Sequence, residues 1–174
     1  RYRRAMAAAE IGVIGGSGFY TFLDDVTEVA VETPFGAPSE PVAVGTVGER
    51  TVAFIPRHGR DHRFPPHQIP YRANLWALRS LGVRQVIAPS AVGALTPEYG
   101  PGTLAVPDQL VDLTRSRDQT FYGDGAVHVS FADPYCPVGR NAAIATARQA
   151  GWERVVGSGT LVVIEGPRFS TRAE

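Results

Sequence analysis

The chain has 174 residues, 44% of them hydrophobic, which is enough to bury one sizeable core. Its 17 basic residues are all arginine and balance 17 acidic residues, so we expect no nucleic-acid partner and no membrane-surface binding. The lack of lysine excludes Schiff-base chemistry and a P-loop, and no apolar run approaches the ~20 residues of a membrane helix. A small-molecule partner fits this composition best.

The cysteine content and the N-terminal residues indicate the compartment and the extent of the domain. Cys136 is the single cysteine, so an internal disulfide and a cysteine-based zinc cluster are excluded and a reducing, cytoplasmic setting is expected. Residues 1–9 are basic and then small, and we expect a disordered extension rather than a signal peptide. Residues 10–174 are predicted to belong to a single domain.

Apolar runs bounded by turn residues predict six strands. They cover residues 10–15, 41–47, 50–55, 84–89, 103–107 and 159–165. A turn at Gly48 predicts that the second and third form an antiparallel hairpin.

Two helices are predicted from the hydrophobic spacing. In the first, Tyr71, Leu75, Leu78 and Leu81 share a face and Gly82 ends the helix. The second covers residues 138–150. Strands that alternate with helices predict an α/β fold with a mixed, largely parallel central sheet flanked by helices, and ligands of such sheets gather where strands end.

The first strand runs into a glycine-rich loop, IGVIGGSG, at residues 11–18. Glycines at 15, 16 and 18 around Ser17 leave backbone N–H groups free to surround an oxyanion. The pattern is not the dinucleotide motif G-x-G-x-x-G. On these residues alone, a plain turn is the favoured interpretation.

Residues 57–62, RHGRDH, follow the third strand directly and concentrate cationic side chains on a short loop. His58, His62 and His67 suggest a metal site, but Asp61 is the only carboxylate there, so an anion site is favoured. A solvated turn in which Arg57 and Asp61 pair with neighbours is an equal alternative for the loop read alone.

A second strand end, APSAVGAL at residues 88–95, again combines a serine with small residues. If Ser17, Arg57, His58 and Ser90 converge, they form a site for a tetrahedral anion. No nucleophile-elbow G-x-S-x-G is present, so anion binding is favoured over serine hydrolysis.

Seven ordered motifs carry a family resemblance, and they span residues 11–174: IGVIGGSG, TPFGAPS, RHGRDH, YRANLWALRSLG, SAVGAL, FADPYCP and EGPRFSTRAE. The chain resembles the S-methyl-5'-thioadenosine phosphorylases of the trimeric purine nucleoside phosphorylase family. The resemblance implies a pentosyltransferase: phosphate attacks C1' of a purine nucleoside and releases the base and a pentose 1-phosphate. It implies no metal and no organic cofactor, since inorganic phosphate is a substrate.

The resemblance also implies residue roles. Ser17, Arg57, His58, Ser90 and the backbone N–H of Ala91 bind phosphate and, by holding it beneath C1', act as catalytic residues.

Four further residues resemble nucleoside contacts. Phe169 stacks near the base or ribose, Ser170 takes part in base selection, His62 lies near the ribose 5' end, and His128 is lent by the neighbouring subunit of a homotrimer. Read without the resemblance, Phe169 is equally a core residue and His128 an ordinary strand histidine.

The family continues beyond the last motif with the ribose contacts, a further phosphate hydroxyl and the residue that donates to purine N7. We therefore expect a C-terminally truncated phosphorylase domain that is inactive alone; Thr171 and Glu174 have the spacing of a capping box that opens a helix. Methylthioadenosine is the favoured substrate, and 6-oxopurine nucleosides or methylthioinosine are the alternative. A non-catalytic phosphate- or nucleoside-binding module is the alternative of another class.

Overall fold

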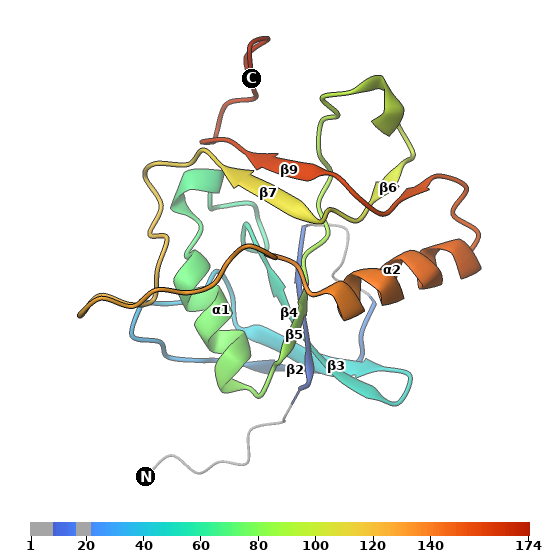
Figure 1. The fold of residues 1–174 in the computed structure, drawn as a ribbon. Coiled ribbons are helices and arrows are strands. Elements are labelled where there is room, and N and C mark those ends of the chain that lie inside the picture. Colours follow the sequence, from blue (N-terminus) through green and yellow to red (C-terminus); the bar gives the residue numbers. More distant parts are fainter. Residues whose placement is uncertain (1–8, 17–21) are drawn as a thin grey trace. The chain divides into compact units, whose positions relative to one another are not determined.

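The computed structural model describes residues 9–16 and 22–174 (Figure 1). The chain divides into two compact units, one up to Ala91 and one from Val92, and each is described by itself. Within the described residues, no helix is both long and apolar enough to cross a membrane.

The first unit contains a five-stranded mixed sheet in the order β2-β3-β4-β1-β5. Its strands are β1 (Ile11–Gly15), β2 (Asp24–Val29), β3 (Val42–Val47), β4 (Arg50–Pro56) and β5 (Gln85–Ile87). β1 pairs in parallel with β4 and with β5, whereas β3 is antiparallel to both β2 and β4. This confirms the mixed sheet with a parallel centre.

The β3–β4 hairpin follows from its turn chemistry. Val47 pairs with Arg50, so residues 48 and 49 form the connection, and Gly48 has a φ of 57°. Such a left-handed conformation favours glycine, which lacks a Cβ atom. The predicted hairpin turn at Gly48 is therefore confirmed.

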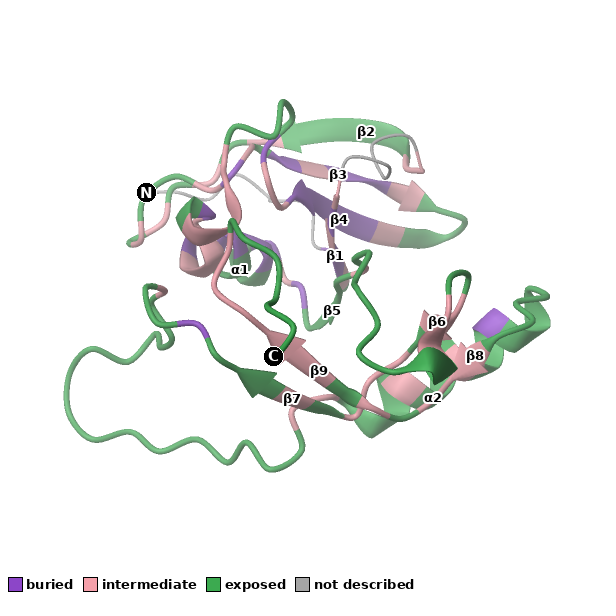
Figure 2. Ribbon diagram, turned by 90° about the horizontal axis from the view of Figure 1, so that it is seen from above, coloured by how far each residue is buried: buried purple, intermediate pink, exposed green. Residues whose placement is uncertain are grey.

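Strand β4 is buried on both faces (Figure 2). Ala53 and Ile55 join a core cluster with helix residues Ala77 and Leu78, whereas Phe54 belongs to a second cluster with Val13 and Val52. Alternate side chains of a strand point to opposite faces, so a central strand between two apolar layers has a continuous hydrophobic sequence.

Helix α1 (Tyr71–Ser80) buries Ala73, Asn74, Ala77 and Leu78. Leu75 is 40% exposed, so its predicted place on the buried face is wrong. The buried face is centred on Asn74 and Leu78, four residues apart, and Leu75 lies about 100° away from Asn74 around the helix. The hydrophobic pattern misses this because the fully enclosed position is occupied by an asparagine.

The end of α1 is as predicted. The N–H of Gly82 donates to the Arg79 carbonyl at 3.1 Å, and the N–H of Val83 donates to the Leu78 carbonyl at 3.2 Å. These two bonds and the positive φ of Gly82, 98°, form a Schellman motif.

Two features of the first unit differ from the sequence predictions. Ala9 is 1% exposed and its N–H donates to the Leu81 carbonyl at 3.0 Å, so placing it in a disordered extension is wrong; residues 1–8 lie outside the described part. Strand β2 was not predicted, because its sequence DDVTEV is polar and mostly exposed at the sheet edge.

The second unit contains two short parallel strand pairs. β6 (Leu104–Ala105) pairs with β8 (Val155–Val156), and β7 (Gln109–Asp112) pairs with β9 (Thr160–Val163). Strands β7 and β8 were not predicted, and the predicted strands 103–107 and 159–165 are shorter than expected. Helix α2 (Pro137–Gln149) confirms the second predicted helix.

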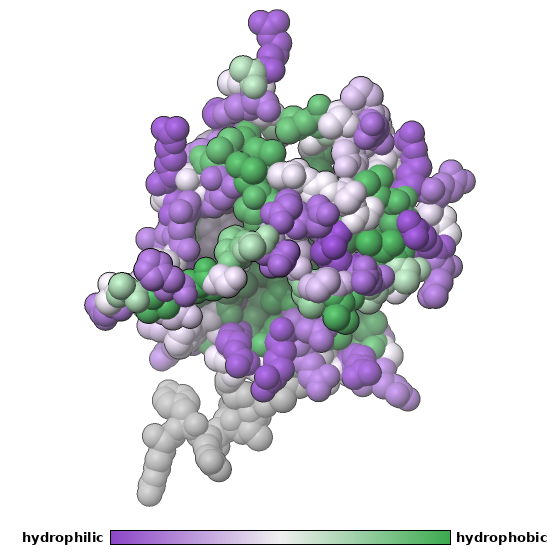
Figure 3. All heavy atoms as spheres, in the orientation of Figure 1, coloured by the Kyte–Doolittle hydropathy of each residue, from purple (hydrophilic) through white to green (hydrophobic). Residues whose placement is uncertain are grey.

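Many large apolar side chains of the second unit are exposed, and Figure 3 shows apolar residues at the surface among hydrophilic ones. Val127, Val129 and Phe131 are 49%, 63% and 64% exposed along one irregular segment. Exposed apolar area of this kind is typical of surfaces that are covered by further protein.

Candidate functional site

Three parallel strands bring their carboxyl ends to one edge of the first sheet. Gly15 of β1 pairs with Pro56 of β4, and Val13 of β1 pairs with Ile87 of β5. The loops after these strands carry the glycine-rich segment, Arg57 with His58, and Ser90 with Ala91. The edge is therefore the position at which ligands of α/β sheets bind.

Arg57 and His58 are the two central residues of a tight turn, residues 56–59, which we call the cation turn. The N–H of Gly59 donates to the Pro56 carbonyl at 3.1 Å and closes it. The N–H of Arg57 donates to the Gly15 carbonyl at 2.9 Å, so the turn is joined to the end of β1. A Cβ atom on Gly16 would lie 4.0 Å from Arg57 Nη2, which places the guanidinium beside the glycine loop.

The ring of His58 is held in one orientation. Its Nδ1 lies 2.9 Å from the Phe64 carbonyl oxygen. A carbonyl only accepts hydrogen bonds, so Nδ1 is the donor in this contact and Nε2 is the ring atom available to a ligand. The N–H of Phe64 also donates to the His58 carbonyl at 3.1 Å, which fixes the residue from both sides.

The remaining residues assigned to phosphate lie as follows. Ser90 and Ala91 are exposed and follow β5 by three and four residues. Ser17 lies outside the described residues. The sheet thus brings the segments of Arg57, His58 and Ser90 to the same edge, and their roles toward phosphate stay predictions.

The residues assigned to the nucleoside lie in different surroundings. His62 is exposed, has a φ of 53°, and stacks on His58 with ring centroids 5.7 Å apart. Phe169 is 95% exposed, so the core alternative for it is wrong in this chain. Ser170 and His128 are also exposed, and His128 belongs to an irregular segment rather than a strand.

Sequence reasoning missed two buried polar residues next to the cation turn. Ser39 and Asn74 are 0% and 2% exposed. The Ser39 hydroxyl donates to the Pro56 carbonyl at 2.6 Å, and Asn74 Oδ1 accepts from the Ser39 N–H at 2.8 Å. Polar residues such as serine and asparagine are usually exposed, so the sequence contains no signal that this pair is buried.

The second unit contains a cavity of about 550 Å³ at the carboxyl ends of β7 and β9. It is lined by Asp112, Leu113, Thr114, Arg115, Ile164, Glu165, Arg168 and Glu174. No motif in the sequence indicates this cavity.

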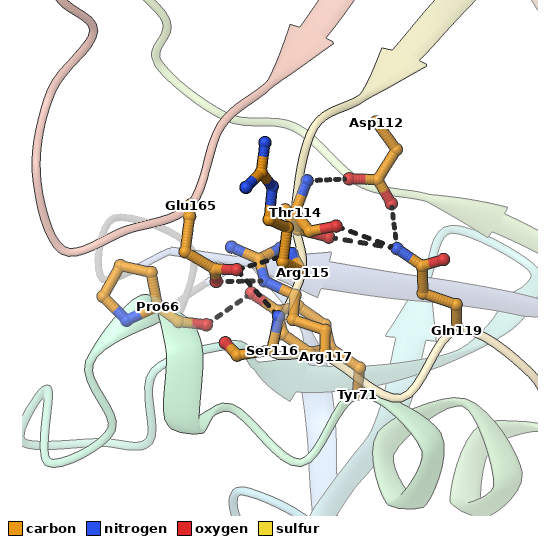
Figure 4. A network of polar contacts seen from close by, with 9 residues as sticks. All are labelled: Pro66, Tyr71, Asp112, Thr114, Arg115, Ser116, Arg117, Gln119 and Glu165. Carbon is orange, nitrogen blue, oxygen red and sulfur yellow. Dashed lines mark hydrogen bonds and ion pairs between the residues drawn. The ribbon is translucent and has the colours of Figure 1, made fainter.

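Glu165 organises one wall of that cavity (Figure 4). Its carboxylate accepts from the N–H groups of Arg115 and Ser116 at 2.7 and 2.9 Å. Donors that favour the charged form lower the pKa of Glu165 below its ordinary value, first the Arg115 N–H and then the Ser116 N–H. The carboxylate therefore serves to hold the backbone after β7.

The predicted capping-box pair is present at the other wall. The Thr171 N–H donates to Glu174 Oε2 at 2.8 Å, and the Glu174 N–H donates to Thr171 Oγ1 at 3.3 Å. Arg168 adds two bonds of 2.7 Å to the same carboxylate, and these bonds, followed by that of the Thr171 N–H, lower the pKa of Glu174 to about 2. Among the described residues, no group of three or more His, Cys, Asp or Glu side chains is arranged to hold a metal ion.

The mixed sheet, whose parallel strands end in a glycine loop, an Arg-His turn and a serine loop, is that of an α/β protein with a candidate anion site at one sheet edge. The chain belongs to the phosphorylase superfamily, whose family model matches residues 10–174. This confirms the predicted fold class and family.

Individual relatives cover nearly all of this chain. It is 66% identical to a purine nucleoside phosphorylase of Streptomyces coelicolor, over 95% of this chain and 62% of the relative. It is 64% identical to an S-methyl-5'-thioadenosine phosphorylase of Mycolicibacterium smegmatis, over 94% of this chain and 61% of the relative. The chain thus spans about three-fifths of the length of these curated relatives.

Among solved structures, methylthioadenosine phosphorylase from Schistosoma mansoni in complex with adenine superposes with a TM-score of 0.90. Sequence identity is 37%, and the match covers 95% of this chain and 68% of that one.

Proposed function

We propose that the whole protein is a pentosyltransferase that cleaves S-methyl-5'-thioadenosine with inorganic phosphate, giving adenine and 5-methylthioribose 1-phosphate. The observation that carries the proposal is the cation turn, which holds Arg57 beside the glycine loop at the end of β1. The choice of substrate is supported by relatives that are 52–64% identical and named S-methyl-5'-thioadenosine phosphorylases.

In the proposed reaction, a phosphate oxygen forms a bond to C1' while the C1'–N9 bond breaks and its electron pair goes to the purine. Positive charge develops on the sugar, and a phosphate held beneath C1' both stabilises it and attacks it. We assign the Arg57 guanidinium, His58 Nε2, the Ser17 and Ser90 hydroxyls and the Ala91 N–H to the phosphate oxygens. No metal or organic cofactor enters this scheme.

For the nucleoside we propose that Phe169 stacks on the purine or ribose, that Ser170 contributes to base selection and that His62 lies near the 5'-methylthio group. The exposure of Phe169, 95%, supports its role, because an aromatic ring must be accessible to stack on a ligand.

We propose a homotrimer in which His128 reaches the 5' pocket of the neighbouring subunit. The exposed apolar residues on either side of it, Val127 and Val129, support a protein–protein interface here. We also propose a cytoplasmic location, since Cys136 is a free and exposed thiol, which suits a reducing compartment.

A second candidate substrate is a 6-oxopurine nucleoside or methylthioinosine. It is favoured by the relative from Streptomyces coelicolor, which is 66% identical and named a purine nucleoside phosphorylase.

One experiment tests both candidate substrates. The whole protein is incubated with methylthioadenosine, methylthioinosine or inosine, with and without phosphate, and the released base is quantified. We expect phosphate-dependent release of adenine with the highest kcat/KM. Faster release of hypoxanthine would favour the second candidate, and no release from any of the three would contradict the proposed function.

A further inference from the structure

The cation turn is attached to helix α1 by a short chain of buried hydrogen bonds. Asn74 of α1 accepts from the Ser39 N–H at 2.8 Å through Oδ1, and the Ser39 hydroxyl donates to the Pro56 carbonyl at 2.6 Å. That carbonyl also accepts the 3.1 Å bond from Gly59 that closes the turn. Ser39 thus bonds directly, and Asn74 through Ser39, to the carbonyl oxygen that closes the turn of Arg57 and His58.

The residue after Ser39 holds the following part of the same loop. Glu40 Oε1 accepts from the Arg60 N–H and from Arg63 Nη2, both at 3.1 Å. Arg63 Nη2 also donates to the Ser39 carbonyl at 2.7 Å. Residues 39 and 40 therefore contact the loop at its start, through Pro56, and at its middle, through Arg60 and Arg63.

Because these polar groups are buried, losing a hydrogen-bond partner is costly for each of them. The Glu40 side chain is 15% exposed, and Ser39 and Asn74 are almost completely enclosed. A buried polar group that loses its partner retains the cost of its desolvation, so the backbone stays where the partners are satisfied. Cutting the chain of bonds removes one of the hydrogen bonds that hold the Pro56 carbonyl and leaves the turn less firmly fixed.

We propose that Asn74 and Ser39 are positioning residues for anion binding: they hold the cation turn so that Arg57 and His58 face the phosphate. This rests on the proposed phosphorolysis. Groups outside a site that orient its ligands, like the outer hydrogen-bond partners of metal ligands, typically affect affinity about 10- to 100-fold. Because Arg57 and His58 lie in the turn itself, whereas the proposed nucleoside contact His62 lies outside it and touches it only by stacking on His58, the larger effect falls on phosphate.

The test compares KM values for phosphate and for methylthioadenosine in the whole protein. Ser39→Ala and Asn74→Ala are expected to raise the phosphate KM about 10-fold or more, with less than about a 3-fold change in nucleoside KM. Asn74→Asp keeps an acceptor at Oδ1. Its phosphate KM is therefore expected to stay near that of the unsubstituted protein, even if its melting temperature falls.

Leu78→Ala is the matched control, since Leu78 is 1% exposed, four residues along the same helix, and packs against the same core without a polar link to the turn. It is expected to lower the melting temperature and leave the phosphate KM unchanged.

The proposal is overturned if the phosphate KM follows the melting temperature across all four variants, or if Ser39→Ala leaves the phosphate KM unchanged. If the unsubstituted protein releases adenine without phosphate, the proposed function fails instead. If Asn74→Ala does not fold, the phosphate KM values of Ser39→Ala and Asn74→Asp test the proposal.

Discussion

Arg57 is the residue on which the proposed chemistry most depends, because its guanidinium lies beside the glycine loop and its backbone is bonded to the end of β1. A guanidinium can bind two oxygens of a phosphate at once through its planar N–H groups. The turn, its partner strand and the glycines together give one cation a defined position at the sheet edge.

Replacing Arg57 by Ala is therefore expected to weaken phosphate use. Loss of a charge-assisted hydrogen bond costs about 1.5–3 kcal/mol, which corresponds to roughly a 10- to 150-fold higher phosphate KM. Steady-state kinetics at varied phosphate measures this. Arg60→Ala is the control, since its side chain pairs with Glu28 on the surface and such pairs contribute little. Equal changes in phosphate KM for the two substitutions would show that Arg57 does not bind phosphate.

Glu174 gives a prediction for pH. Its pKa is lowered to about 2 from an ordinary value of 4.5, first by the Arg168 side chain. A depressed folded-state pKa means that the contribution of this pair is present above about pH 4.5 and is lost as pH falls toward 2. Carbon-13 NMR of the carboxyl group measures it directly, and Arg168→Gln is expected to raise the pKa. A midpoint near the ordinary value in the unsubstituted chain would show that the pair does not form in solution.

At the scale of elements, strands and helices with strong hydrophobic patterns were predictable. Strand β4 and its hairpin were found because the apolar run and Gly48 give two independent signals. Strand β2 was missed because a polar edge strand has no buried face to mark it. Asn74 and Ser39 were missed for a related reason: their burial depends on hydrogen bonds to distant residues, which spacing along the chain does not reveal.

The corrected face of α1 makes a prediction of its own. Leu78→Ala is expected to lower the free energy of unfolding by about 2–5 kcal/mol, because Leu78 is 1% exposed in the core. Leu75→Ala, at a position 40% exposed, is expected to change it by about 0.5 kcal/mol or less. Urea unfolding of both variants distinguishes the observed face from the one that the hydrophobic spacing predicted, for which the two losses would be equal.

At the scale of the whole molecule, the candidate phosphate site could be predicted only in part. The sequence indicates which residue types stand at the strand ends, and the sheet order brings those ends to one edge. That Arg57 and His58 share one tight turn, and that His58 donates through Nδ1, depends on contacts with Gly59 and Phe64 that no sequence pattern specifies.

The proposed assembly is tested by sedimentation of the whole protein at micromolar concentration, where we expect a trimer. Phe131→Asp, which places a charge at a side chain that is 64% exposed, is expected to weaken it, since charge is unfavourable in an interface core. Val138→Asp, at a side chain that is 76% exposed in α2 and outside this segment, controls for the added charge itself. A fully active monomer would exclude a pocket shared between subunits.

The central claim is that phosphate itself becomes part of the product. Phosphorus-31 NMR of a reaction with methylthioadenosine tests this most directly, because it follows the phosphorus atom from inorganic phosphate into the sugar phosphate. The account predicts a pentose 1-phosphate signal that grows in equal amount with released adenine and is strongly reduced by Arg57→Ala. Adenine release with the inorganic phosphate signal unchanged would contradict it.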